Sequence, residues 1–167
     1  MRNRQKGFSL IELLIVVAII LIIAAIAIPN LLRSKMSANE SSSVGSLRTI
    51  NTAEVTYAAA YPDTGYSADM PSLGGDPATC TTTATVALSC LIDNTLATAT
   101  AAATAKSGYF FTYALNGAAG GINTAYTLLA SPAGAGTTGQ RFFFTDESGV
   151  IRYGLTGAAD PTSSAIQ

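Results

Sequence analysis

The sequence predicts an α+β protein in which a long N-terminal α-helix, transmembrane in its first half, packs on a small antiparallel four-stranded β-sheet. Three observations lead to this prediction. An uninterrupted apolar run fills residues 13–28, an apolar stripe at helical spacing continues to Tyr61, and large aromatic side chains alternate with other residues after Tyr109. The 167 residues are enough for one modest domain with an appendage.

The first 28 residues divide into a basic leader, 1–7, and an apolar segment, 8–28. A helix of 21 residues at about 1.5 Å per residue is roughly 31 Å long, which is enough to cross the hydrocarbon core of a bilayer. Because Arg2, Arg4 and Lys6 precede this segment, we expect the N-terminus to lie in the cytoplasm and the rest of the chain outside.

A secretory signal peptide is the alternative interpretation of this segment, because Ala25-Ile26-Ala27 partly matches a cleavage site. The apolar run is longer than the usual signal, however, and Glu12 lies inside it. A carboxylate at membrane depth costs about 2.5 to 3.5 kcal/mol and usually has a partner. Glu12 therefore requires a role of its own.

Residues Gly7 to Ile20, GFSLIELLIVVAII, resemble the prepilin cleavage and methylation motif of type IV pilins and the related pseudopilins. The resemblance implies that a prepilin peptidase cuts after Gly7, methylates the new amine of Phe8 and leaves the apolar helix attached. Removal of the three leader cations would leave six basic residues against ten acidic ones, a side-chain charge of −4.

The resemblance also implies a function and a set of partners. The chain would be the major pilin of a type IV pilus, held in the inner membrane before assembly and polymerised into an extracellular filament for adhesion, motility or DNA uptake. Its partners would be copies of itself, the prepilin peptidase and methyltransferase, and an inner-membrane assembly platform. Glu12 would pair with the Phe8 amine during assembly. A minor pilin or a type II secretion pseudopilin shares this N-terminal motif and remains an alternative.

The second half of the predicted helix occupies residues 29–61. Pro29 removes one helical hydrogen bond and predicts a kink, where the resemblance places a bend in the pilin helix. Pro62 ends the helix after Tyr61. The resemblance implies that this half packs on a small sheet. Its charged residues make it amphipathic and place it outside the membrane: Arg33, Lys35, Glu40, Arg48 and Glu54.

Residues 62–107 contain several Pro and Gly residues and then a Thr- and Ala-rich stretch, which predicts a structured loop. Cys80 and Cys90 lie in this stretch without a neighbouring His or a CxxC spacing. In a chain exported to an oxidising compartment they predict a structural disulfide, and a pair of buried free thiols is the alternative.

Residues 108–167 carry the strand signals and a C-terminal tail. The four predicted strands are 109–115, 126–130, 141–145 and 150–153. The turn between the last two, 146–149, contains a Gly that can supply a positive φ angle and predicts a hairpin.

Composition argues against other functions. There is no His, and the acidic residues are too widely spaced for a calcium loop, so we expect no metal, no cofactor and no catalytic site. No basic face offers a nucleic-acid site. An electron-carrying filament, suggested by the aromatic residues, is a further alternative, although aromatics that fill a helix-sheet core explain the same pattern.

Overall fold

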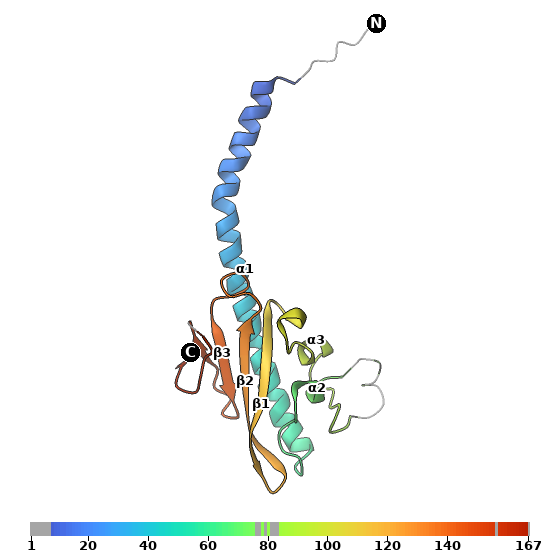
Figure 1. The fold of residues 1–167 in the computed structure, drawn as a ribbon. Helices are drawn as coiled ribbons and strands as arrows, with labels where there is room; N and C mark the ends of the chain where they lie inside the picture. Colours follow the sequence, from blue (N-terminus) through green and yellow to red (C-terminus); the bar gives the residue numbers. More distant parts are fainter. Residues whose placement is uncertain (1–7, 76–77, 79, 81–83, 156, 167) are drawn as a thin grey trace. The chain divides into compact units, whose positions relative to one another are not determined.

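The computed structural model describes residues 8–75, 78, 80, 84–155 and 157–166. The chain divides into two compact units, residues 1–35 and 36–167, and each is described by itself. The elements are α1 (Leu10–Ala60), α2 (Met70–Leu73), α3 (Asn94–Ala97), the 3₁₀ helix η1 (Ala102–Thr104), β1 (Tyr109–Ala119), β2 (Ile122–Pro132), β3 (Phe142–Asp146), β4 (Arg152–Gly154) and β5 (Ser164–Ala165) (Figure 1).

Helix α1 is a single helix of 51 residues with Pro29 inside it. Its start at Leu10 and its end at Ala60 agree with the sequence prediction to within two residues. The chain leaves the helix through a turn in which Gly65, at φ +76°, donates its N–H to the carbonyl of Tyr61. The long helix of the predicted α+β fold is therefore present.

The sheet is an antiparallel meander in the order β1-β2-β3-β4-β5. Gly120 and Gly121, both at positive φ, form the two-residue turn between β1 and β2. The predicted hairpin between β3 and β4 is confirmed, with Gly149 at φ +72° donating its N–H to the carbonyl of Asp146.

Among the described residues the sheet has five strands in place of the predicted four. The additional strand, β5, pairs with β4 through Arg152 opposite Ala165 and Tyr153 opposite Ser164. It has only two residues, so it is too short to show an alternating pattern. The first two strands are also longer than predicted, because small polar and Gly residues near the β1–β2 turn continue the pairing without an aromatic signal.

The core of the unit formed by residues 36–167 lies between the second half of α1 and one face of the sheet (Figure 1). From α1 it takes Leu47, Ile50 and Tyr57, all fully buried. The sheet supplies every second residue of its strands, as the two-residue period requires: Tyr109, Phe111, Tyr126, Leu128, Ala130 and Phe143. The apolar stripe of the helix therefore packs on the domain as predicted.

The segment between α1 and β1 is structured by two short helices. Asp69 caps α2 by accepting the N–H of Ser72, and Asp93 caps α3 by accepting the N–H of Leu96. Asp93 also pairs with Lys106 at 3.1 Å. These caps satisfy backbone donors at the starts of both helices, and the described residues of this segment contribute no strand to the sheet.

Candidate assembly segment

The candidate assembly segment is the first half of α1 with the residues before it. Ser9 occupies the N-cap position, and its N–H donates to Oε2 of Glu12 at 2.9 Å. This is one half of a capping box, in which the side chain of the third helical residue satisfies a free donor at the start of the helix. This cap was not predicted, although the pattern Ser9-x-x-Glu12 is its signature in the sequence.

Glu12 remains exposed in this position. Its second carboxylate oxygen, Oε1, makes no hydrogen bond within the described residues. Phe8 lies four residues earlier and is 78% exposed. Gly7, the predicted cleavage residue, lies outside the described residues, so cleavage stays a prediction.

Almost every side chain from Phe8 to Ile28 is exposed within its unit, and only Ala24 is half-buried. The large apolar side chains of this stretch are between 45% and 78% exposed. Among the described residues, α1 is the helix that is long and apolar enough to cross a membrane by length and composition. A helix that is apolar all round must be surrounded by lipid or by other helices. The segment therefore needs partners beyond the described residues of its own unit.

The second half of α1 carries two buried carboxylates, whose burial was not predicted from the sequence. Glu40 is 7% exposed and Glu54 is fully buried. Both lie three or four residues from members of the apolar stripe, which is the spacing of one helix face. That spacing was the available signal, and the charge of the residues concealed it.

Glu40 joins the helix to the start of β3. Its Oε1 accepts the backbone N–H groups of Gln140, at 2.9 Å, and Arg141, at 3.1 Å, and its Oε2 accepts Nε of Arg141 at 2.7 Å. Burial alone would raise the pKa of this carboxyl, but the three hydrogen bonds and the guanidinium charge outweigh burial and hold the pKa below its usual value.

Glu54 has no cation as a partner within the described residues. Its two oxygens accept the hydroxyl of Ser67 at 2.6 Å and the N–H of Ser67 at 3.0 Å. Tyr113 closes the site by donating its hydroxyl to the carbonyl of Ser67 at 2.9 Å. Burial raises the pKa of the Glu54 carboxyl despite these hydrogen bonds. The pKa values of two glutamates on one helix are thus shifted in opposite directions.

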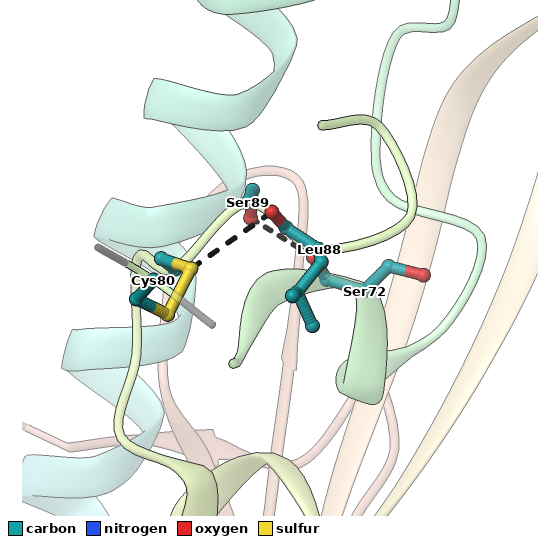
Figure 2. The surroundings of a disulfide bond; sticks show 5 residues. Ser72, Cys80, Leu88 and Ser89 are labelled. Carbon is teal, nitrogen blue, oxygen red and sulfur yellow. Dashed lines mark hydrogen bonds between the residues drawn. A yellow bond between two sulfur atoms is a disulfide. The ribbon is translucent and has the colours of Figure 1, made fainter. Parts of the chain in front are cut away.

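Cys80 and Cys90 form the predicted disulfide (Figure 2). The chain around Cys90 is fixed to α2, because the Ser89 hydroxyl donates to the carbonyl of Ser72 and the Cys90 N–H donates to the carbonyl of Gly74. Gly75 packs against both sulfur atoms, and a Cβ at this position would collide with Sγ of Cys80 and lie 2.6 Å from Sγ of Cys90. Helix α1 contacts the same loop through the Tyr57 hydroxyl, which donates to the carbonyl of Val86 at 2.7 Å.

Two observations on the described part of the chain concern metal binding and aromatic contacts. No group of three or more His, Cys, Asp or Glu side chains could hold a metal ion there. The ring contacts fall into three separate groups: Tyr57 with Tyr61, Tyr126 with Tyr66 and Tyr113, and Tyr109 with Phe143.

The comparison with protein families matches the segment described above. Residues 2–28 match the prokaryotic N-terminal methylation motif. Over part of its length the chain is similar to type IV pilins. Over 40 residues it is 65% identical to the type IV wide pilus major component PilA4 of Thermus thermophilus, and over 54 residues it is 46% identical to the type IV major pilin protein PilA of Myxococcus xanthus.

The pilin similarity is confined to part of the chain. The two matches cover 24% and 32% of this chain and 30% and 24% of the respective relatives, so less than a third of either relative is spanned. No solved structure matches the chain. For residues 36–167, the evidence for the fold is therefore the structure described above.

Proposed function

We propose that the chain is a structural subunit, and specifically the major pilin, of a type IV pilus. The observation that carries this proposal is the exposed apolar helix after Phe8, whose one charged side chain up to Ile28 is Glu12 and which coincides with the matched methylation motif. Such a helix is stable only in lipid or among other helices. Both relatives are named as major components or major pilins, which favours the major pilin over a minor pilin or pseudopilin.

The proposed processing follows from the leader. The cations of residues 1–7 hold the N-terminus in the cytoplasm, and a prepilin peptidase cuts after Gly7 and methylates the amine of Phe8. The mature chain then starts at the exposed Phe8, and its helix keeps its apolar length. Before assembly it spans the inner membrane once, and an assembly platform transfers it to the extracellular filament. Pro29 allows the helix to bend during this transfer.

Glu12 has the central role in the proposed assembly step. Cleavage creates a positive amine at Phe8 that is buried among helices when the subunit joins the filament. Oε1 of Glu12 has no hydrogen bond to a described residue, so it is available to the amine of a neighbouring subunit. An unpaired buried charge costs about 3 to 5 kcal/mol, whereas the pair itself adds little. Glu12 would therefore be needed for polymerisation and dispensable for membrane insertion.

The N-terminus of the mature protein tests the processing step. N-terminal and intact-mass analysis of sheared surface filaments is expected to give a methylated Phe8. A chain that begins at Ile28, after Ala25-Ile26-Ala27, would instead establish a secretory signal peptide and overturn the proposal.

Fractionation of a Glu12→Ala variant tests the assembly step. We expect a normal or larger membrane-bound pool, because removal of a costly carboxylate favours insertion, and a strong loss of surface fibres. Glu147→Ala is the matched control, since Glu147 is an exposed carboxylate in the β3–β4 turn without an ion pair in the described structure. Normal fibre yield from Glu12→Ala would refute the pairing mechanism. A wild-type chain that is abundant in membranes and scarce in fibres would point to a minor pilin or pseudopilin.

A further inference from the structure

Strand β1 forms one edge of the sheet, and only the first part of that edge is covered by described residues. Tyr109 exchanges two backbone hydrogen bonds with Lys106, and Phe111 donates its N–H to the carbonyl of Ala99. Backbone groups of an edge strand point alternately toward the neighbouring strand and away from it. The backbone N–H and C=O groups of Tyr113 and Leu115 therefore also point away from β2.

The outward backbone groups of Tyr113 and Leu115 have no backbone partner among the described residues. The neighbouring side chains are open as well, since Ala114 is exposed and Leu115 is 38% exposed. A β-bulge between Leu115 and Gly117 follows this stretch and does not cover it. We call residues 112–115 the open edge.

The open edge lacks the charges with which proteins usually protect an exposed strand. Between Lys106 and Arg141 the sequence contains no Asp, Glu, Lys or Arg, although edge strands commonly carry a charge that opposes pairing. At the opposite edge of the sheet, β5 has only two residues. The open edge is thus the longer of the two surfaces at which the sheet can be extended.

We propose that the open edge pairs antiparallel with the open edge of a second copy of this chain. Antiparallel pairing of a strand with itself has two-fold symmetry, so the strand is complementary to its own copy in length and hydrogen-bonding groups. With the axis at Ala114, Tyr113 of each copy lies opposite Leu115 of the other, and the two pairs exchange four backbone hydrogen bonds. No like charges meet in this arrangement.

The symmetry of this contact decides where it acts in a pilus. A filament grows through head-to-tail contacts, whereas a two-fold contact closes on itself. The open edge therefore joins subunits of two adjacent filaments and produces lateral bundling. A single contact of two residues per copy is weak, but it repeats along both filaments, so the total strength increases with the number of contacts. This inference rests on the proposed function.

Cysteine cross-linking in intact filaments tests the register. At the two-fold axis, Ala114 of one copy faces Ala114 of the other as a non-hydrogen-bonded pair, with about 4.5 Å between the Cα atoms, which is within the range of a disulfide. We expect Ala114→Cys filaments to give disulfide-linked dimers on mild oxidation. Ala118→Cys is the matched control, because this residue is exposed on the same strand but would lie about 26 Å from its own copy, eight residues along.

A charge variant tests the bundling itself. Leu115→Lys places like charges near each other across the axis, so we expect the fraction of fibres that sediments as bundles to fall at least tenfold at low salt and to recover partly at high salt. Leu155→Lys, at a residue 67% exposed and outside the sheet, should leave bundling unchanged. Equal cross-linking at residues 114 and 118, no cross-linking at 114, or unchanged bundling of Leu115→Lys would overturn the inference while leaving the filament subunit intact. Absence of wild-type filaments would instead refute the proposed function.

Discussion

The contact between Glu40 and Arg141 allows a quantitative prediction for Glu40→Gln. The carboxylate accepts two backbone N–H groups through Oε1 and Nε of Arg141 through Oε2. A glutamine keeps one acceptor oxygen for the backbone groups but turns its own N–H₂ toward the Arg141 donor. A hydrogen bond to a charged group contributes about 1.5 to 3 kcal/mol. Because the Arg141 side chain is 37% exposed, solvent screening reduces this figure, and we expect a loss of about 2 kcal/mol.

This loss has two measurable consequences. At about 2.1 cal/mol/K per residue for the unit of residues 36–167, the midpoint of thermal unfolding should fall by about 7 °C. The pKa of Glu40 is lowered in the folded state, so its contribution to stability is present above the unfolded pKa of about 4.3 and is lost as pH falls through the lower folded pKa. The free energy of unfolding of Glu40→Gln should therefore depend less on pH at acid pH, the acid limb of the profile, than that of wild type.

The assay is urea and thermal unfolding of the full-length protein in detergent between pH 2 and pH 8. Glu147→Gln serves as the control, since removal of an exposed turn carboxylate should change stability by less than about 0.5 kcal/mol. An unchanged midpoint together with an unchanged acid limb in Glu40→Gln would show that the contact does not hold the helix to the sheet.

The remaining predictions concern the other buried carboxylate and the disulfide. Burial raises the pKa of Glu54, so its stabilising contribution is present below the unfolded pKa and is lost as pH rises through the folded pKa; the stability of Glu54→Gln relative to wild type should increase from pH 4 to pH 8 in the same unfolding assay. Replacing Cys80 and Cys90 with Ala should lower the free energy of unfolding by about 2 to 3 kcal/mol, and reduced wild type should unfold at the same urea concentration as this variant. Gly75→Ala should leave thiols that react with a labelling reagent, whereas Gly45→Ala, in open space on α1, should leave none.

The sequence predicted those features that depend on residues close together in the chain. The long apolar helical segment, the methylation motif and the β3–β4 hairpin each occupy a few dozen residues or fewer, and their signals are periodicity, charge and a Gly in a turn. The disulfide was predicted because only two cysteines were present and the chain was expected to be exported.

The errors arise where a distant residue decides the outcome. The burial of Glu40 was not predicted, because the donors that allow it lie about 100 residues later in the sequence. Glu54 is buried for the same kind of reason, since Ser67 reaches it from the segment beyond the helix. Strand β5 exists only because β4 offers it an edge to pair with.

The position of Glu40 along α1 has a mechanical consequence. It is the first buried residue of the helix, and Asn39 beside it donates to the carbonyl of Thr138 at 2.8 Å. If a filament is pulled through its helices, tension enters each globular unit at these two residues before it reaches the apolar core. The hydrogen bonds from these two residues to residues 138–141 would be loaded at the same time. The helix would then have to break them together in order to separate from the sheet.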